Sequence, residues 1–324
     1  AALFLSYFDY QVYTKFWPVI AVFCVIIMLV LFKWGTGPSS RPDARTWLSI
    51  GPINFQPSEL VKIGFIITFG VHLDKVKEKI NNIFSILQLG AHAAVPIVLV
   101  AATGDMGSAL VFMVIAIVMM FVAGVHWGYF LGGIALVGAA TPLIWTYVLK
   151  QLQKDRFLAL IYPDLYPDII YQQQRGLNAI GAGGITGQGL FKGAYTQAGA
   201  VPESQNDMIF SVVGEELGFI GCITALLLIV LITVRIIYVG KKSSEQSTNL
   251  ICTGMAAMII GQMIINVGMC LMLLPVIGIT LPFFSAGGSS NLCVYLGIGI
   301  VMSIYRHNCD TGAVNIRVYD SLKK

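Results

Sequence analysis

Long apolar runs dominate the pattern of hydrophobic and polar positions along the chain. A helix needs roughly 20 mostly apolar residues to cross the hydrocarbon core of a bilayer, and these runs lack the period of two that membrane strands require. We therefore expect an all-α fold, a polytopic bundle of transmembrane helices with eight complete spans. The predicted spans are residues 17–33, 57–74, 89–102, 107–124, 128–149, 208–238, 249–275 and 287–305. Residues 1–8 are expected to end a further span, whose beginning is missing.

The composition supports a membrane environment. Of 324 residues, 56% are hydrophobic and 11% are charged, whereas soluble domains carry about 25% charged residues. This excludes an ordinary soluble enzyme, a disordered chain and a nucleic-acid-binding protein. The net charge of +4 is attributed to Lys and Arg in cytoplasmic loops. We expect a single integral membrane domain over residues 1–324.

One connection is much longer than the others. Residues 150–207 form a predicted loop of 58 residues with several prolines and the glycine-rich run GAGGITGQG at 181–189. Long structured loops in compact proteins are usually functional or disordered. Within this loop, the segment DRFLALIYPDLYPD has a partly amphipathic pattern and is predicted to lie at the membrane interface.

Lys and Arg are distributed unequally between the two sets of short loops. Eleven lie on one side of the predicted bundle and three on the other. Because cytoplasmic loops carry the excess of positive charge, the first side should be cytoplasmic. The outer side then holds the 34–56 loop, Asp105, the 150–207 loop as a large extracellular loop, and the 276–286 loop.

Two charged residues lie within one predicted span. Charges inside a span are costly and are therefore functional candidates. Glu59 and Lys62 follow Pro57, which suits the first turn of a helix, and their i, i+3 spacing places them on one face. They form either a structural ion pair that holds two helices together or a site in which Lys62 faces an anionic ligand and Glu59 orients it.

Further polar residues precede predicted spans on the outer side. Asp105, in ATGDMGSAL, is either the N-cap of the following helix, a role that Asp fills well, or a functional acid. Arg41, Arg45 and Trp47 stand before the second span. They are either interfacial anchors or, since Arg binds phosphate in bidentate fashion, ligands of a phosphate group.

The segment PESQNDMIFSVVGEELG at 202–218 carries the strongest local signal. Asp207 stands where the long loop enters a span, and Glu215 and Glu216 follow about two turns deeper. An acid at an interface near apolar surface can have a raised pKa and act as a general base. The alternative is that Asp207 caps the helix and the two glutamates are polar packing groups. Asn266, in the next span, is expected to form an interhelical hydrogen bond.

Several catalytic signatures are absent from the sequence. No G-x-G-x-x-G, G-x-x-x-x-G-K or G-x-S-x-G motif occurs, and the four histidines lack the spacing of metal ligands. Classical nucleotide binding, zinc hydrolysis and serine hydrolysis therefore have no support. His92, within a span, is expected to be a satisfied core residue rather than a ligand.

Five segments resemble, in order, the signature blocks of the SEDS family (shape, elongation, division and sporulation proteins). They are RPDARTWLSIGPINFQPSELVK, GDMGSALV, YQQQRGLNAIGAGGITGQGLFKG, PESQNDMIFSVVGEELGFIG and NVGMCLMLLPVIGITLPFFSAGGSS. The resemblance covers nearly the whole chain and favours the RodA branch over FtsW and SpoVE. It implies ten transmembrane helices with both ends cytoplasmic, which fits the eight spans if the first helix and most of the second are missing.

The resemblance also implies an activity. A peptidoglycan glycosyltransferase of this family polymerises lipid II into glycan strands at the outer face of the bacterial cytoplasmic membrane, for cell elongation and shape. The transfer would be inverting, with undecaprenyl pyrophosphate as the leaving group. The expected partners are lipid II, a class B penicillin-binding protein (a transpeptidase) and membrane lipid, with no nucleic acid. A lipid II flippase without bond chemistry and a scaffold for the transpeptidase remain alternatives.

The resemblance assigns roles to individual residues. Asp207 matches the catalytic acid of the large extracellular loop and is the expected base. Residues matching other blocks or lying near them are expected to bind substrate: Lys62, Glu59, Arg45, Arg41, Asp105, Trp47, Arg175, Lys192 and Ser289. The one cofactor considered is a divalent cation, Mg²⁺ or Mn²⁺, held by Asp105 or Asp207.

The chain departs from the family pattern at four positions. Met208 replaces the usual Phe after the catalytic acid, and Ala286 replaces the usual Tyr of the SYGGSS block. Arg175 stands where Ser is common. Gln188 stands where Lys is common and removes one phosphate contact, although Lys192 is nearby.

Overall fold

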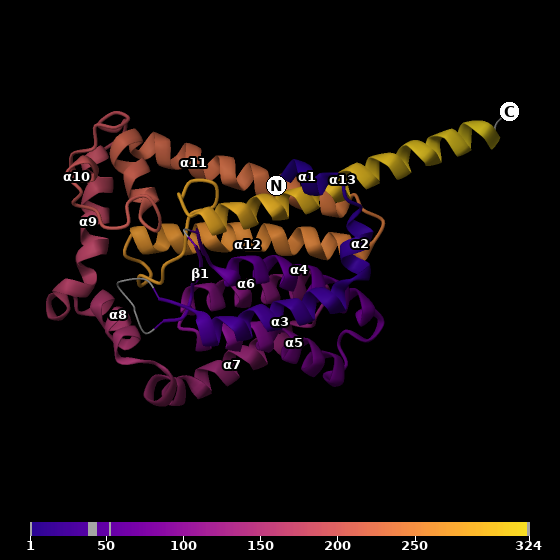
Figure 1. The fold of residues 1–324 in the computed structure, drawn as a ribbon, viewed down its shortest axis with the longest axis horizontal. Coiled ribbons are helices and arrows are strands. Elements are labelled where there is room, and N and C mark those ends of the chain that lie inside the picture. Colours follow the sequence, from indigo (N-terminus) through magenta and orange to yellow (C-terminus); the bar gives the residue numbers. More distant parts are fainter. Residues whose placement is uncertain (1, 38–43, 52, 323–324) are drawn as a thin grey trace. The chain divides into compact units, whose positions relative to one another are not determined.

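The computed structural model describes residues 2–37, 44–51 and 53–322, and helices dominate it (Figure 1). The chain forms two compact units, which are described one at a time. Unit 1 comprises Ala1–Val125, Leu231–Ile259 and Gly288–Lys324, and unit 2 comprises His126–Val230 and Ile260–Gly287. The single integral membrane domain expected over residues 1–324 stays a prediction.

Unit 1 contains most of the long helices and a small hairpin. Its elements are α1 (Ala2–Ser6), α2 (Tyr10–Lys15), α3 (Trp17–Trp34), β1 (Leu48–Ile50), β2 (Ile53–Phe55), α4 (Pro57–Lys75), the short 3₁₀ helix η1 (Lys77–Lys79), α5 (Ile83–Ala102), α6 (Met106–Val122) and α13 (Gly288–Leu322). The later residues of α11 (Ile209–Lys241) and the earlier residues of α12 (Gln246–Cys270) also belong to this unit.

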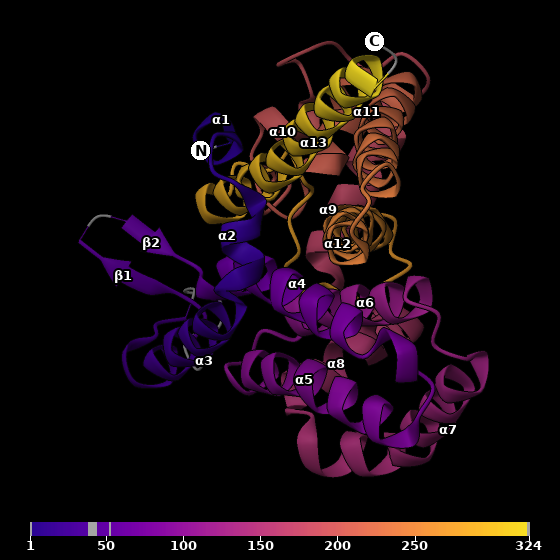
Figure 2. The same ribbon diagram turned by 90° about the vertical axis from the view of Figure 1, so that its right-hand side faces the viewer.

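Helix α4 lies at the core of unit 1. Every residue from Val61 to Val71 is buried, because α3, α5, α6 and α13 all contact this helix. Figure 2 shows α4 beside α6, with α5 next to both. Pro57 occupies the first turn, where its missing N–H costs nothing. Lys62 and Thr68, the polar residues of this stretch, are therefore surrounded by protein.

All eight predicted spans are helical. Within the described residues, six helices are by themselves long and apolar enough to cross a membrane: Trp17–Trp34, Ile83–Ala102, Trp127–Tyr147, Ile209–Lys241, Gln246–Cys270 and Gly288–Asn308. Helix α6 is apolar but has 17 residues, and α4 has 19 residues of lower hydropathy. The predicted class, an all-α polytopic membrane bundle, is confirmed.

Two helix ends differ from the sequence prediction, because side chains form hydrogen bonds with the terminal backbone groups at other positions than expected. Helix α5 begins at Ile83 rather than at residue 89, since the side chain of Asn82 accepts a hydrogen bond from the Phe84 N–H (3.0 Å). Helix α12 ends at Cys270 rather than at residue 275. There the side chain of Gln173 donates to the carbonyl oxygens of Met269, in the last turn of the helix, and of Leu274, in the following loop, both at 2.8 Å.

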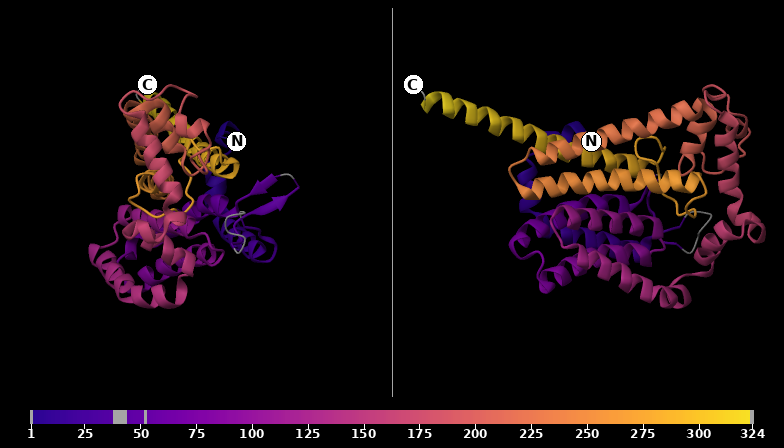
Figure 3. Two further views of the ribbon diagram at one scale, coloured as in Figure 1. Left: turned by 90° about the vertical axis from the view of Figure 1, so that its left-hand side faces the viewer. Right: turned by 180° about the vertical axis from the view of Figure 1, so that it is seen from behind.

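The predicted 34–56 loop contains a two-stranded antiparallel hairpin that the sequence analysis did not expect. Strand β1 pairs with β2 in a register that joins Leu48 to Phe55. Gly51 follows β1 with φ of +61°, a conformation that glycine adopts without strain. The hairpin stands at the edge of its unit, beside α3 (Figures 2 and 3).

Unit 2 replaces the predicted loop of residues 150–207 with a series of helices. They are α8 (Gln151–Ile161), the short η3 (Pro163–Leu165), α9 (Pro167–Gly183) and α10 (Ala194–Gln197), preceded by α7 (Trp127–Leu143) and the π-helical turn η2 (Ile144–Val148). Helix α9 buries Ile170, Gln173, Gly176 and Ala179 at three-residue spacing, the pattern of an amphipathic helix. The interfacial position expected for α8 stays a prediction.

Candidate active site

Asp207 lies in unit 2, in a turn directly before α11, and its side chain is half-buried. Three successive backbone carbonyls hold this turn. The Gln205 carbonyl accepts from the Ala286 N–H (2.8 Å), the Asn206 carbonyl from the Ser285 hydroxyl (2.7 Å), and the Asp207 carbonyl from the side-chain amide of Asn266 (2.8 Å). The path of the chain at the predicted catalytic acid is therefore fixed by its backbone.

Asn266 and Ser285 each join this turn to a second segment. Asn266 also donates to the carbonyl oxygen of Ile279 (2.7 Å). The Ser285 hydroxyl accepts from the Leu281 N–H (2.8 Å). Asn266 was expected to bond another helix, and this was wrong: its side-chain amide donates to carbonyls of the turn and of the 271–287 loop. These carbonyls need a donor because they belong to no regular element.

Ala286, a departure from the family pattern, takes part through its backbone alone. Its N–H holds the Gln205 carbonyl, so this contact does not depend on the side chain at position 286.

Glu215 and Glu216 anchor the loop that follows α9. The carboxylate of Glu215, fully buried, accepts from the N–H groups of Tyr195 (2.6 Å) and Thr196 (2.9 Å) and from the Thr196 hydroxyl (2.5 Å). Glu216 accepts from the Phe191 N–H (2.9 Å). Of the two roles considered, polar packing groups describe them better than a general base.

Helix α11 is interrupted at Gly218, so the span predicted at residues 208–238 is two helical pieces. Gly218 has φ of +66° and ψ of −165°, a region essentially restricted to glycine. The N–H groups of Phe219 and Ile220 after the break donate to the carbonyls of Gly184 (2.9 Å) and Ile185 (3.1 Å). The glycine-rich run thus caps the second piece of the helix.

The same run also donates hydrogen bonds to carbonyl groups at the end of the first piece of α11. The N–H groups of Gln188 and Gly189 donate to the carbonyls of Glu215 and Glu216, both at 3.0 Å. A Cβ atom at Gly187 would collide with the Glu216 carbonyl. The glycines of residues 181–189 therefore allow backbone to approach backbone, and the run has a structural explanation without a bound phosphate.

The predicted substrate-binding residues of unit 2 lie on α9 and on the anchored loop. Arg175 on α9 stacks over the ring of Tyr171, 5.1 Å from its centroid, and Lys192 is exposed in the loop. Gln188 donates to the Ala182 carbonyl (3.2 Å) and accepts from the Ala194 N–H (2.9 Å). Its amide therefore stabilises the loop where a family lysine would carry charge.

In unit 1, Asp105 is the N-cap of α6. Its Oδ1 accepts from the Ser108 N–H (3.0 Å), and its Oδ2 accepts from Gln56 Nε2 (2.9 Å) and the Ser58 hydroxyl (3.1 Å). The capping alternative is therefore confirmed. Both of its oxygens accept hydrogen bonds from protein donors in this arrangement.

Ser289 belongs to the same network through Gln56. Its hydroxyl accepts from the Gln56 N–H (3.1 Å) and donates to the Asn54 carbonyl (3.4 Å). Gln56 therefore links the start of α13 to Asp105. Sequence reasoning did not single out Gln56, although its position directly before Pro57, at the N-cap of α4, was a usable signal.

Glu59 and Lys62 form an ion pair on α4, with Lys62 Nζ 2.8 Å from Glu59 Oε1. Lys62 is fully buried and Glu59 is 5% exposed. The structural alternative is confirmed in part: the pair exists, but it lies within one helix instead of between two. In this arrangement Lys62 does not face a ligand.

The residues of the 34–56 segment have backbone partners. The guanidinium of Arg45, which is exposed, donates to the Phe32 carbonyl, and its N–H donates to the Thr103 carbonyl (2.8 Å). Trp47 forms a β-bridge with Thr36. Arg41 lies outside the described residues.

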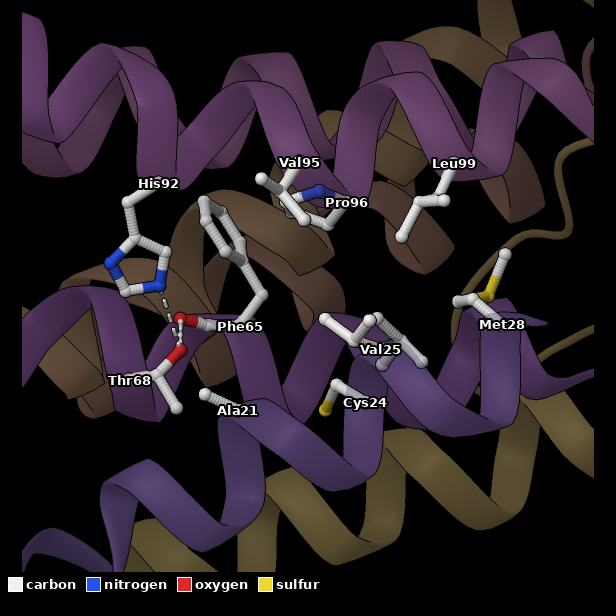
Figure 4. Close-up of a pocket in the computed structure, with 11 residues that line it drawn as sticks. Ala21, Cys24, Val25, Met28, Phe65, Thr68, His92, Val95, Pro96 and Leu99 are labelled. Atoms are coloured by element: carbon white, nitrogen blue, oxygen red, sulfur yellow. Dashed lines mark hydrogen bonds between the residues drawn. The ribbon is translucent and has the colours of Figure 1, made fainter.

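An apolar pocket of about 150 Å³ lies between α3, α4 and α5 (Figure 4). Its walls include Met28, Val61 and Leu99, and His92 lies at one end. His92 contacts the Thr68 hydroxyl (3.2 Å) and His72 Nδ1 (2.9 Å). The expectation that His92 is a satisfied core residue is confirmed in part: its ring nitrogens have partners, but the residue is half-buried.

Comparisons with known proteins agree with this architecture. The model of the FtsW/RodA/SpoVE family, described as cell cycle proteins, matches residues 1–310. The peptidoglycan glycosyltransferase MrdB of Escherichia coli K12 is 29% identical over 300 residues, which cover 92% of this chain and 80% of MrdB. The probable peptidoglycan glycosyltransferase FtsW of Geobacter sp. strain M18 is 32% identical over 303 residues, covering 91% and 80%.

The fold is also similar to a solved structure. A chain from a structure of a peptidoglycan synthase complex, concerned with the coordination of polymerization and crosslinking, superposes with a TM-score of 0.81 at 26% identity, covering 95% of this chain and 85% of that one. The preference for the RodA branch stays a prediction, since both MrdB and FtsW are among the relatives. The resemblance to the SEDS family is confirmed, and the chain belongs to the FtsW/RodA/SpoVE family of cell cycle proteins.

Proposed function

We propose that this protein is a peptidoglycan glycosyltransferase that polymerises lipid II into glycan strands. Family membership over residues 1–310 and relatives that carry this activity in their names support the assignment. The observation that carries it is the anchored turn at Asp207, where three successive carbonyls are held by Asn266, Ser285 and Ala286. Such anchoring presents one half-buried carboxylate in a fixed place, as a general base requires.

The transfer can be written around that carboxylate. Asp207 accepts the proton of the acceptor sugar hydroxyl while the hydroxyl oxygen forms a bond to the anomeric carbon of the donor. The bond from that carbon to undecaprenyl pyrophosphate breaks, and its electron pair leaves with the pyrophosphate, so the configuration inverts. A positioned base contributes about 10² to 10⁴ in rate, and the transition state has oxocarbenium character.

Cationic side chains would stabilise the departing pyrophosphate. Within unit 2, Arg175 and Lys192 suit this role: among the described residues, neither belongs to a salt bridge. The substrate-binding roles of Arg41, Arg45, Trp47 and Ser289 stay predictions. For Lys62, Glu59 and Asp105, the contacts in unit 1 favour structural roles.

A divalent cation remains a proposal. Within the part of the chain that the structure describes, no three His, Cys, Asp or Glu side chains form a metal-binding group. Either Asp105 or Asp207 would supply the protein ligand. Phosphate oxygens of the substrate are ligands that Mg²⁺ prefers, and they would have to complete the site.

The proposed setting is the bacterial cytoplasmic membrane, with Asp207 on the outer face. The chain is a multi-pass membrane protein, and the excess of Lys and Arg on the opposite side supports this orientation. The proposed partner is a class B penicillin-binding protein. Its support is the structural likeness to a chain of a complex that coordinates polymerization with crosslinking.

Polymerisation of lipid II by the purified chain in detergent tests the proposal. Detergent removes any need for flipping, so labelled glycan polymer on a gel demonstrates bond chemistry. The wild type should form polymer, alone or with the penicillin-binding protein, and Asp207→Asn should not. Asp164→Asn, at an exposed acid of the same unit, is the matched control. Adding a chelator and then restoring Mg²⁺ or Mn²⁺ tests whether polymerisation requires a divalent cation.

Each other outcome identifies an alternative. If the wild type forms no polymer but moves lipid II across vesicles, the flippase is favoured. If Asp207→Asn polymerises at the wild-type rate within the complex, the base is not Asp207. That result would favour the alternative in which this chain is a scaffold for the transpeptidase.

A further inference from the structure

A groove lies in unit 1, between the last third of α11 and α13, in addition to the apolar pocket beside His92. It has a volume of about 490 Å³ and is lined by Leu231, Ile236 and Val239 of α11 and by Ile298, Val301 and Met302 of α13. Its walls are almost wholly apolar. Leu231 is 62% exposed, so the groove opens sideways from the helices and an apolar occupant could enter from the bilayer.

The other side of α13 is already covered by the N-terminal helices. Gly299 lies against Ala2 and Leu5 of α1, and the Ser303 hydroxyl donates to the Phe8 carbonyl (2.6 Å). Arg306 stacks over the ring of Tyr7 on that side, at 5.2 Å. The groove face is thus the part of α13 that these helices leave uncovered.

Basic and aromatic residues border one end of the groove. Arg235 and Tyr305 line it, and Tyr238 and Lys242 lie beside Arg235 without lining it. The guanidinium of Arg235 lies 5.2 Å from the ring centroid of Tyr238 and 5.4 Å from that of Tyr305. Lys242 lies 4.8 Å from the centroid of the Tyr238 ring. The salt bridges found among the described residues are Glu59–Lys62 and Asp74–Lys77. Neither Arg235 nor Lys242 belongs to either of these two ion pairs.

The length of the groove matches one leaflet of a bilayer. Its lining runs from residue 231 to 239 on α11, which corresponds to about 12 Å at 1.5 Å per residue. One leaflet contributes about half of the roughly 30 Å hydrocarbon core. The arrangement places Arg235, Tyr238 and Tyr305 toward the end where lipid headgroups lie, and tyrosine is enriched at that level.

We propose that this groove binds an anionic phospholipid, with an acyl chain along the apolar walls and the phosphate on Arg235 and Lys242. Charge complementarity selects this occupant, because basic pockets between membrane helices bind anionic headgroups. A zwitterionic lipid would carry a choline or ethanolamine cation next to these two cations. This site is separate from the turn at Asp207 and does not depend on the proposed transferase activity.

Native mass spectrometry of the full chain tests the site. The protein, purified in mild detergent, is titrated with phosphatidylglycerol and with phosphatidylcholine of the same acyl chains. We expect phosphatidylglycerol to bind more tightly. Arg235→Gln should weaken its binding about fivefold, and the double change with Lys242→Gln should weaken it further by a similar factor. Arg235→Lys should retain most of the binding.

Two variants separate charge from shape. Arg306→Gln removes a cation from the covered side of α13 and should leave phosphatidylglycerol binding unchanged. Val301→Trp fills the groove and should weaken both lipids. Thermal unfolding of each variant shows whether the fold is kept, and Arg235→Lys provides the folded comparison.

Three results would overturn the proposal. One is equal affinity for the two lipids, and another is unchanged phosphatidylglycerol binding in Arg235→Gln. The third is a lipid-independent dimer of the chain that Val301→Trp dissociates, because a second copy would then occupy the groove.

Discussion

The side-chain amide of Asn266 donates to the backbone carbonyl oxygen of Asp207 at 2.8 Å, and also to that of Ile279 at 2.7 Å. Asn266 is fully buried near the end of α12; its bond to Ile279 is buried and its bond to Asp207 is part-buried. The amide joins the turn that carries the predicted base to the loop that follows α12. The position of the Asp207 backbone thus depends on a residue that need not touch substrate.

Replacing Asn266 by Ala should impair catalysis more than folding. The carbonyls of Asp207 and Ile279 lose this donor, at about 1–3 kcal/mol for a buried group left unsatisfied, and the Asp207 turn loses one of its three anchors. We expect the rate of lipid II polymerisation to fall at least tenfold while the helical circular dichroism signal is kept. Asn178→Ala, at an exposed position of α9, should leave the rate unchanged. Wild-type polymerisation by Asn266→Ala would show that this bond does not position the base.

Gly218→Ala should be among the most damaging small substitutions in unit 2. Its φ of +66° with ψ of −165° is strained for any residue with a Cβ, at about 1–3 kcal/mol. The added Cβ would also collide with the Gly187 nitrogen and Ile185 carbonyl. We expect a marked loss of thermal stability, measured as the midpoint of unfolding in detergent.

Gly138→Ala is the matched control for that experiment. Gly138 lies inside α7 with no neighbouring atom near an added Cβ, so alanine should stabilise the helix by about 0.5–1 kcal/mol. Equal effects of the two substitutions would contradict the account of the break in α11.

The sequence predicted the helices well because the period and length of apolar runs are direct consequences of membrane burial. It failed where hydrogen bonds to backbone N–H and carbonyl groups decide where a helix ends or breaks. The end of α12 at Cys270 depends on Gln173, which is almost 100 residues away in the chain. The break at Gly218 depends on carbonyls of the glycine-rich run. Neither partner can be paired with its target from a hydrophobic pattern.

In the candidate site too, contacts between neighbouring residues could be predicted from the sequence, and contacts between distant segments could not. The N-cap role of Asp105 was foreseen, because capping is local and a helix followed directly. The partners of Glu215 were not, because residues 191–197, which include the four-residue helix α10, carry no hydrophobic pattern that would place the N–H groups of this helix against a carboxylate. The predicted catalytic role of Asp207 rests on its place at the start of a span and on family resemblance, and the structure adds the anchors of its turn.

Glu215 should control the order of the loop that carries Lys192. Its carboxylate accepts three hydrogen bonds from Tyr195 and Thr196, and bonds to a charged acceptor are worth about 1.5–3 kcal/mol each. Glu215→Gln should therefore accelerate amide hydrogen exchange at residues 191–197, measured by mass spectrometry. Glu78→Gln, at an exposed position of unit 1, should not. Unchanged exchange in Glu215→Gln would refute the anchoring role.

A double substitution tests whether the buried pair of Glu59 and Lys62 has a structural role. Removing one partner of a buried ion pair leaves an uncompensated charge and costs about 3–5 kcal/mol, whereas replacing both by apolar residues is often neutral or stabilising. Lys62→Met and Glu59→Leu should each lower the unfolding midpoint, and the double variant should recover most of the loss.

The activity of that double variant then separates the two roles considered for Lys62. If the pair is structural, as its burial in unit 1 indicates, restored stability should bring restored polymerisation of lipid II. If Lys62 binds the anionic substrate in a conformation other than this one, the double variant will be stable yet impaired, with a raised KM for lipid II. Because the side-chain ammonium of Lys62 is fully buried and held at 2.8 Å by Glu59, we expect the first result.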